Sequence, residues 1–308
     1  MSLHKQSGVV IVVALFVVAL IATMAYFMMM HLYRDTRRTA LILRQDQASF
    51  YAQGSLNWAK DQLRNNWDVR KPDQPIDILP IKSPIIKVDG FQITSKIEDI
   101  QARFNINNLQ NAEVHVDFKR LLQTVIPELN EEQLQTLLTS IFDWISAQHP
   151  DSPTQQYYLR LPEPYRPAHR LMVSLSELQL VKGMTKPMYE RLKPFLIALP
   201  ESTKINVRTA SPQVLLTLSP TLTLAGAQII ERVRKQNPLA TLNDILTAEP
   251  LRKFQLQADK TTLDSEYFLV ETEVRIEKQR IVLYTLLNRK ANENSVDTIV
   301  IWQSKGMW

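Results

Sequence analysis

The sequence contains no cysteine, which excludes disulfides, thiolate metal sites and cysteine nucleophiles. Only 6 of its 308 residues are glycine, too few for several of the glycine-rich loops that cradle phosphates. The 5 histidines form no HExxH pair, and no GxSxG elbow, P-loop or dinucleotide fingerprint is present. Carboxylate pairs such as Glu271 and Glu273 fall on one face of a predicted strand, where exposed glutamates are common. The sequence therefore predicts a protein that is not an enzyme.

Charge is absent from one long stretch near the start of the chain. The formal net charge of the whole chain is only +5, whereas nucleic-acid binders concentrate basic residues in a stripe. Val9 to Met30 is uncharged throughout and long enough to cross a hydrocarbon core of about 30 Å. A buried core helix rarely stays apolar on all sides for so long. A cleaved secretory signal has an apolar region of about 7–15 residues and ends in small residues, unlike Met28–Met30. A transmembrane helix over residues 9–30 is predicted.

Residues 1–8 form a short leader that is basic at Lys5 and ends in Gly8, immediately before the apolar run. This pattern resembles a type IV pilin-like leader. In that family a prepilin peptidase cuts after the glycine and methylates the new N-terminus, which here would be Val9. Lys5 and the polar bulk after the span indicate that the N-terminus stays inside. The charge bias is incomplete, because three basic residues lie on the other flank: Arg34, Arg37 and Arg38.

The fifth position after the predicted cleavage site is Val13. Most pilin-like proteins carry a glutamate there, and a lone carboxylate in lipid costs a few kcal/mol. In the family that glutamate is thought to pair with the terminal amine of the subunit ahead. An apolar Val13 suits a subunit at the tip of a filament, which has no subunit ahead of it. The alternative is a lipid-facing valine in an anchor unrelated to pilins.

After the membrane, residues 31–67 are predicted to continue the same helix as a spine. No proline occurs from Tyr33 to Trp67. Apolar residues recur at roughly helical spacing, so this half is expected to pack on a soluble domain; they are Leu41, Ile42, Phe50, Tyr51, Leu56, Trp58 and Leu63. A helix from Val9 to Leu63 would be about 80 Å long. A proline-rich loop is expected next, at Pro72, Pro75, Pro80 and Pro84.

The remaining chain predicts a small sheet interrupted by helices. Four segments read as strands, the middle two as a hairpin with a turn at Glu277–Gln279; they are Phe91–Ile97, Tyr267–Ile276, Arg280–Leu287 and Asp297–Trp302. The predicted fold is α+β and pilin-like: a long N-terminal helix packed on a small antiparallel sheet with a large inserted all-helical domain. The sheet domain would comprise residues 68–103 and 263–308, and the insertion residues 104–262.

Within the insertion, Glu131–Ile145 is the best-defined predicted helix. Leucines and isoleucines share one of its faces, and Asn130 followed by two glutamates marks its start. Further helices are expected at 174–181, 187–197, 211–218, 224–236 and 242–246, with prolines at several junctions.

An ordered set of short motifs resembles the K-type minor pseudopilins of type II secretion systems. The resemblance extends from Gly8 to the hairpin, and no single motif decides it. The motifs are Gln101–Leu109, Phe142–Ile145, Tyr157–Leu159, Pro164–Arg166, Ser174–Leu178, Val181–Met184, Tyr189–Leu192 and Ile205–Pro212.

This resemblance implies a function and a location. Minor pseudopilins cap a short periplasmic pseudopilus, start its assembly in the bacterial inner membrane and help to export folded proteins across the outer membrane. The implied partners are the I-type and J-type minor pseudopilins, other pseudopilins, the prepilin peptidase and the inner-membrane platform. We expect the partner helices to contact the N-terminal helix, at residues that include Val9, Val13, Leu20, Leu41 and Phe50.

Many proteins of this family bind calcium through an acidic loop, and here that loop departs from the family. Calcium takes 6–8 oxygen ligands, several of them carboxylates. In the segment from Asp143 to Tyr157 only Asp143 and Asp151 are acidic, and Ser146, Gln148, Gln155 and Gln156 stand where acidic residues are expected. We therefore predict no cofactor and no metal, with these two aspartates as the remaining candidate ligands.

A second hypothesis concerns Ile205–Leu246, which resembles a helix-hairpin-helix pair. Such modules contact nucleic-acid phosphates through backbone N–H groups in a glycine-rich turn. The turn here, Ser219–Ala225, has no glycine. Nearby basic residues could also belong to a solvated helix face; they are Lys204, Arg208, Arg232, Arg234 and Lys235. The alternative function is thus a membrane-tethered module that binds DNA or another ligand.

Overall fold

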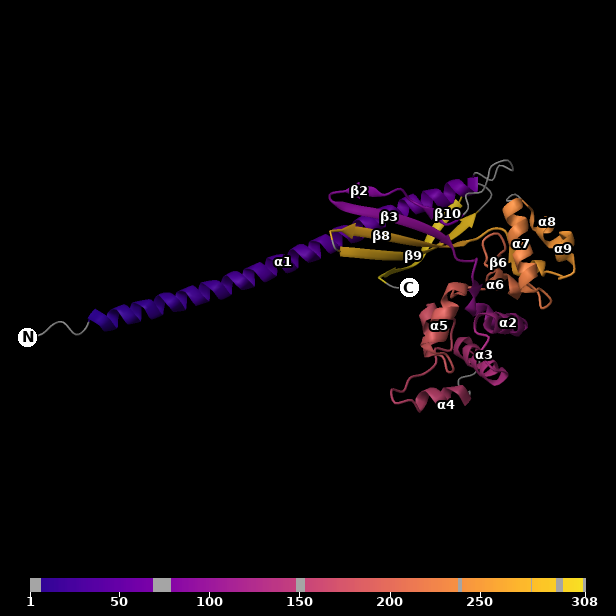
Figure 1. The fold of residues 1–308 in the computed structure, drawn as a ribbon, viewed down its shortest axis with the longest axis horizontal. Helices are drawn as coiled ribbons and strands as arrows, with labels where there is room; N and C mark the ends of the chain where they lie inside the picture. Colours follow the sequence, from indigo (N-terminus) through magenta and orange to yellow (C-terminus); the bar gives the residue numbers. More distant parts are fainter. Residues whose placement is uncertain are drawn as a thin grey trace, which may run out of the picture.

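The structure is a computed structural model, and it describes residues 7–68, 79–147, 153–237, 240–277, 279–291 and 296–306. Helix α1 (Ser7–Asp68) extends away from the rest of the molecule, with the N-terminus at its far end (Figure 1). Its 62 residues correspond to about 90 Å at 1.5 Å per residue. Residues 31–67, predicted as a spine, form its second half.

The sheet is antiparallel and has six strands in the described part of the chain. Its order is β1-β3-β8-β9-β10, and β2 pairs with β3 beside β1. The strands are β1 (Ile81–Lys82), β2 (Ile86–Val88), β3 (Phe91–Asp99), β8 (Tyr267–Ile276), β9 (Gln279–Ala291) and β10 (Val296–Lys305). The four predicted strands are confirmed as β3, β8, β9 and β10. The sequence missed β1 and β2, because strands of two and three residues are too short to show an alternating pattern.

One face of the sheet packs against α1, largely through alanines that were not predicted. The buried residues of α1 are Ala48, Ala52, Ala59 and Leu63. They contact Phe91, Ile93 and Ile97 of β3, among others. The prediction that the large apolar residues form this face is confirmed for Leu63 and for the partly buried Tyr51, Leu56 and Trp58. It was wrong for Leu41, Ile42 and Phe50, which are exposed. Alanines at the contact allow the helix to lie close to the sheet, as large side chains would not.

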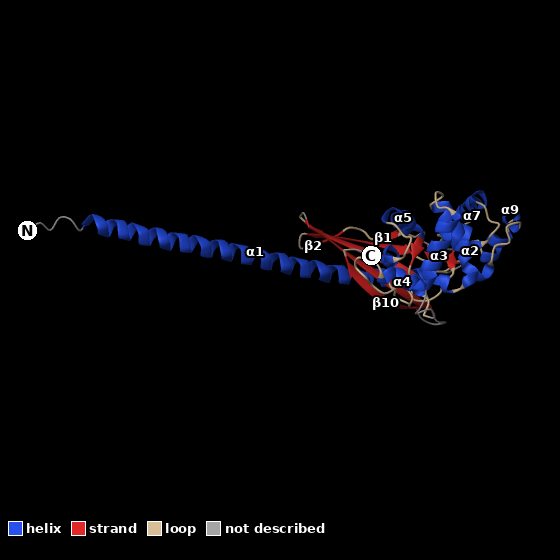
Figure 2. Cartoon of the chain, turned by 90° about the horizontal axis from the view of Figure 1, so that it is seen from below, coloured by secondary structure: helices blue, strands red, loops and turns tan. Residues whose placement is uncertain are grey.

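The opposite face of the sheet carries a second apolar cluster. Ile100, Tyr267, Leu269 and Leu286 pack there with Ile197 and Leu199 from the insertion. Seen from below, the insertion lies at the end of the sheet that is far from the N-terminus (Figure 2). The insertion is therefore joined to the sheet through its own buried side chains as well as through the chain itself.

The insertion begins at β4 (Phe104–Asn105), which pairs in parallel with β5 (Leu196–Ile197), and ends at β7 (Thr261–Thr262), which pairs with β6 (Ile205–Asn206). Between them lie α2 (His115–Val125), α3 (Glu131–Ile145), α4 (Pro153–Leu159), α5 (Lys186–Leu192), α6 (Pro212–Leu215), α7 (Leu224–Gln236), α8 (Leu242–Thr247) and α9 (Glu249–Arg252). These helices share one buried apolar core. Two pairs of short strands make the insertion less purely helical than predicted.

Three of the predicted helices differ from those observed. The helix predicted at 211–218 divides into α6 (Pro212–Leu215) and a 3-10 helix (Leu216–Leu218). Residues 175–180 form a 3-10 helix that is capped by Ser174. The helix predicted at 187–197 ends at Leu192, and Leu196–Ile197 become strand β5. Pro194 cannot donate a backbone hydrogen bond, so it favours an end to the helix. The helices predicted at Glu131–Ile145 and Leu224–Gln236 are confirmed with the same bounds.

The chain passes from the sheet to the insertion and back close to the predicted domain boundaries. The described chain leaves the sheet after Asp99 and enters the insertion at Phe104. It returns after Thr262 to strand β8. The predicted boundary at residue 68 coincides with the end of a described range. The first two prolines of the predicted loop, Pro72 and Pro75, lie outside the described residues.

Candidate assembly surface and domain junction

The first half of α1 is an uncovered apolar rod. One window of 18 residues has a mean hydropathy of 2.9, and none of it is buried. Val13 and Leu20 are 54% and 46% exposed. By length and composition this helix can cross a membrane, and the same helix continues without interruption into the soluble domain. The molecule is therefore a single apolar N-terminal helix that carries a soluble domain on one side.

The predicted processing site lies at the start of this rod. Gly8 and Val9 belong to the first helical residues of α1, and residues 1–6 lie outside the described part of the chain. Cleavage and methylation at this peptide bond stay a prediction. Val13 follows one turn later, and Asp35 is the first acidic residue of α1. The span therefore holds no carboxylate.

Outside the membrane-spanning part, α1 presents an apolar side chain away from the sheet. Phe50 is 73% exposed, and its position lies on the helix face opposite to Ala48 and Ala52. Gly54 follows one turn later, and a Cβ atom built there would meet no atom within 4 Å. A glycine inside a helix costs about 1 kcal/mol relative to alanine. No neighbour in the described part of the chain accounts for this glycine. The sequence analysis did not single out Gly54, although a glycine in the middle of a long predicted helix is unusual.

Two polar contacts hold α1 to the rim of the sheet that faces the N-terminus. The Tyr51 hydroxyl donates to Asp89 Oδ2 at 2.6 Å, and this bond raises the pKa of Tyr51. Arg44 Nη1 lies 3.5 Å from Glu277 Oε2. Asp89 and Glu277 occupy turns and have positive φ angles of 50°. The part of α1 that the domain does not contact through these polar groups therefore lies on the N-terminal side of Arg44.

A buried polar network joins the sheet to the insertion. Asp99, at the end of β3, accepts hydrogen bonds from Gln101 N at 2.9 Å, Asn206 Nδ2 at 2.9 Å and Thr209 Oγ1 at 2.5 Å. Asn206 Nδ2 also donates to Ser265 Oγ at 2.8 Å. Burial raises the pKa of Asp99, and the hydrogen bonds oppose this effect in part. The carboxylate thus connects the segment that enters the insertion to residues around β6. Through Asn206 and Ser265 the network also reaches the segment that leaves the insertion.

Arg289 extends this junction to the spine. Its Nη2 donates to Ser265 O at 2.8 Å and its Nη1 to Leu63 O at 3.3 Å. Its guanidinium lies over the Phe268 ring, 4.6 Å from the ring centre. Helix α1, strand β9 and the end of the insertion therefore meet at one buried cation, a contact that sequence analysis did not anticipate.

The asparagines of the motif Gln101–Leu109 have a structural role. Asn107 Nδ2 donates to Met172 O and Leu199 O, while its Oδ1 accepts from Met172 N at 3.0 Å. Asn105 Nδ2 donates to Glu201 O at 2.7 Å, and its Oδ1 accepts from Leu199 N. These side chains satisfy backbone groups of two loops, which would otherwise be buried without partners. The motif thus holds the insertion together.

The loop in which many proteins of the family bind calcium, and for which no metal is predicted here, is only partly described. Asp143 is buried in the last turn of α3, and Asp151 lies outside the described residues. Within the described ranges, no three or more histidine, aspartate or glutamate side chains gather where they could hold a metal ion. The predicted lack of a metal site stays a prediction.

The helix-hairpin-helix-like segment uses two of its arginines internally. Arg234 Nη1 donates to Val207 O at 2.8 Å and Ala210 O at 2.7 Å, and Arg208 Nη2 donates to Ala240 O. Burial lowers the pKa of Arg234. The turn itself is engaged, because Ser219 and Thr221 both donate to Phe254 O. These contacts argue against the turn as a phosphate-binding loop.

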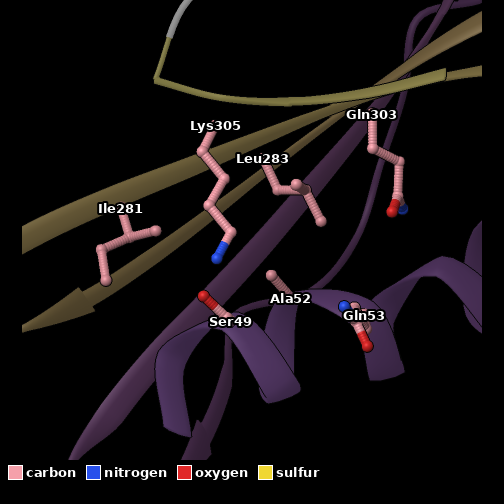
Figure 3. Close-up of a pocket in the computed structure, with 7 residues that line it drawn as sticks. All are labelled: Ser49, Ala52, Gln53, Ile281, Leu283, Gln303 and Lys305. Carbon is pink, nitrogen blue, oxygen red and sulfur yellow. The ribbon is translucent and has the colours of Figure 1, made fainter. Parts of the chain in front are cut away.

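A small groove lies between α1 and the last two strands. Its volume is about 120 Å³, enough for a few water molecules or one side chain. Figure 3 shows its lining residues, which are Ser49, Ala52, Gln53, Ile281, Leu283, Gln303 and Lys305. Among the described residues, none forms a hydrogen bond with the buried Ser49 hydroxyl. The groove is too small for a substrate and adjoins the surface of the spine.

The chain is similar to proteins of one family along most of its length. Two family models, both described as type II secretion system (T2SS), protein K, match residues 102–201 and 205–265, more than half of the chain. Type II secretion system protein K of Pseudomonas aeruginosa is 31% identical, over 92% of this chain and 89% of the relative. The protein of the same name from Pectobacterium carotovorum is 26% identical, over 88% and 89%.

A solved structure has the same fold. It is titled as the GspK-GspI-GspJ complex of the type 2 secretion system from enterotoxigenic Escherichia coli. The matched chain superposes with a TM-score of 0.69 at 19% identity and covers 88% of this chain and 100% of its own length. The fold, the matched domains and the identity to curated relatives agree, and the chain belongs to the protein K family of type II secretion systems.

Proposed function

We propose that this chain is a minor pseudopilin at the tip of a type II secretion pseudopilus, where it starts assembly and helps folded proteins to cross the outer membrane. The observation that carries the proposal is the uncovered α1 rod, which joins an apolar span to an exposed outward face at Phe50. Lipid can cover the apolar span, but an exposed aromatic side chain beyond the membrane, such as Phe50, calls for a protein partner at that level. A parallel helix of another pseudopilin meets that requirement.

The place at the tip follows from the insertion and from Val13. The insertion has its own core and lies at the end of the sheet farthest from the N-terminus. Subunits stacked above would collide with such a domain, whereas a subunit at the end of a filament has open space beyond it. Val13 needs no amine from a subunit ahead.

The apolar span and the leader sequence support the proposed compartment and processing. The chain would be a single-pass protein of the bacterial inner membrane with its soluble domain in the periplasm. The prepilin peptidase would cut between Gly8 and Val9, and the inner-membrane platform would receive the processed helix. All the chemistry proposed for the chain is that of assembly, without a catalytic role and without a cofactor.

The I-type and J-type minor pseudopilins are the proposed partners. The solved structure with the same fold is titled as a complex with these two proteins. Their helices would lie along the exposed residues of α1, which include Val9, Val13, Leu20, Leu41 and Phe50.

A Phe50→Ala variant tests this surface. Its exposed side chain contributes little to the fold, so the thermal midpoint of the full chain is expected to change by less than about 3 °C. Loss of an aromatic anchor at an interface costs about 1–3 kcal/mol, so co-purification with the I-type and J-type partners should fall at least about fivefold. Val116→Ala, at a 59% exposed position on α2, is the matched control. Unchanged co-purification of the Phe50 variant would exclude this face.

A Gly54→Ala variant distinguishes the stability of the free chain from the stability of its complex with partner subunits. Alanine is the better helix former, so the free chain should gain about 0.5–1 kcal/mol of stability, measured by thermal or denaturant unfolding. If a partner helix approaches closely at this position, the added methyl group should weaken the complex at the same time. A more stable chain that assembles as well as the wild type would place the partner elsewhere.

A further inference from the structure

Three arginines follow the membrane span and have no partner in the described part of the chain. Arg34, Arg37 and Arg38 are exposed, and none of them makes an ion pair or hydrogen bond there. Asp35 is the only acidic residue between His31 and Gln45. Positive charge on the side of a span that faces away from the cytoplasm runs against the usual bias. These arginines therefore carry a net charge that the proposed assembly does not explain.

Their spacing places them together on one face of a rigid helix. Positions i, i+3 and i+4 are neighbours on a helix surface, and α1 continues without a break through them. They follow Met30 by four to eight residues, which corresponds to about 6–12 Å along the axis. The headgroup layer adds about 5–8 Å on each side of the hydrocarbon core. The long arginine side chains can turn back along the helix by several ångströms, so all three guanidinium groups can reach the level of the lipid phosphates.

The soluble domain leaves this level open. The contact of the domain closest to the membrane on α1 is Arg44 with Glu277. Arg44 lies fourteen residues beyond Met30, or about 21 Å along the helix. Arg44 is thus engaged by the domain, while the three arginines below it face a stretch of bare helix. Lipid headgroups can surround that stretch without displacing any part of the protein.

We propose that Arg34, Arg37 and Arg38 form a binding site for the phosphate groups of anionic phospholipids in the leaflet on the side of the soluble domain. Guanidinium groups bind phosphate oxygens in pairs of parallel hydrogen bonds. Each basic residue near an anionic membrane surface strengthens binding by roughly fivefold. The site holds the unassembled subunit at a defined depth and keeps its outward face, with Phe50, above the headgroups. Its positive charge favours anionic phospholipids over zwitterionic or neutral lipids.

The test is native mass spectrometry of the full-length chain in detergent, supplied with equal amounts of phosphatidylglycerol and phosphatidylcholine. We expect the wild type to retain phosphatidylglycerol at least about tenfold over phosphatidylcholine. Simultaneous Arg34→Gln, Arg37→Gln and Arg38→Gln should bring this ratio close to one. The corresponding lysine substitutions keep the charge and should keep more than half of the preference. Arg160→Gln, Arg166→Gln and Arg170→Gln together form the matched control, because they remove the same charge from exposed positions on the insertion.

Two results would overturn the proposal. The first is a wild-type lipid ratio in the glutamine variant; if that variant also loses co-purification with the pseudopilin partners, the arginines would be assigned to a neighbouring helix. The second is an equal loss in the insertion control, which would mean that general charge sets the ratio. Because the lipid measurement uses the chain alone, failure of the assembly proposal leaves its outcome unaffected.

Discussion

A Gly8→Ala variant is expected to retain its whole leader when it is expressed with a prepilin peptidase. The wild type under the same conditions should lose Met1–Gly8 and gain one methyl group on Val9. The expected reason is steric, since a peptidase selective for glycine at this position would exclude a side chain with a Cβ atom. The effect should be all-or-none, and intact mass of the membrane-extracted protein measures it directly.

Two controls make this result specific. Wild-type protein expressed without the peptidase should keep the leader, and a Ser7→Ala variant with the peptidase should lose it. A full-length mass in every case would contradict the processing site. The resemblance would then rest on the soluble domain, and a membrane-tethered binding module would become the stronger interpretation of the chain.

An Asp99→Ala variant is expected to destabilise the protein by about 2–4 kcal/mol. The substitution leaves three buried donors, on Gln101, Asn206 and Thr209, without their acceptor. Each unsatisfied donor costs about 1–3 kcal/mol, and removal of a desolvated carboxylate offsets part of that sum. Thermal unfolding of the full chain in detergent measures the change. Asp259→Ala, at an exposed position on the same domain, should change stability by less than about 0.5 kcal/mol.

The same residue gives a pH dependence with a definite sign. Burial raises the pKa of Asp99 in the folded protein above its value in the unfolded chain. The folded state therefore binds the proton more tightly, and the stability from this group is complete below the unfolded pKa and is lost as pH rises through the folded pKa. The stability difference between the wild type and Asp99→Ala should thus grow as pH falls through the raised folded pKa of Asp99 towards its unfolded value. A difference that shrinks would show that the carboxylate is stabilised in its ionised form.

Limited proteolysis can report on the junction independently. If Asp99 couples the sheet to the insertion, its removal should speed cleavage in the segments on either side, Gln101–Arg103 and Asp264–Glu266, before the rest of the chain. Cleavage at the same rate as in the wild type would mean that the apolar contacts of Ile197 and Leu199 hold the junction alone.

The membrane span and the longer strands and helices could be predicted from the sequence, because they depend on composition and on the local spacing of apolar residues. The apolar run of Val9–Met30 needs only its length and lack of charge to predict a span. Strand β8 and helix α3 were predicted from residues that are neighbours in sequence, since strand and helix periods are local properties. The capping box of Asn130 with Gln133, which marks the start of α3, is local too.

The faces of the spine could not be predicted in the same way. The pattern of large apolar residues favoured Leu41 and Phe50 as packing positions, yet the sheet selects Ala48, Ala52 and Ala59. A helix that is apolar on several sides offers more than one face, and the partner with the closest fit decides between them. Only the position of the sheet shows which face stays free for another subunit.

The sequence by itself determined the anchor, the four long strands, the helices at Glu131–Ile145 and Leu224–Gln236, and the family motifs, because each of these depends on residues that are close along the chain. Tertiary structure alone decided the junction, in which Asp99, Asn206 and Ser265 come together from segments far apart in sequence. It also decided which arginines are engaged, such as Arg44, Arg234 and Arg289, and which have no partner in the described part of the chain. The physical reason is that the partners of a buried or charged group are set by the path of the whole chain, and short-range patterns carry no record of that path.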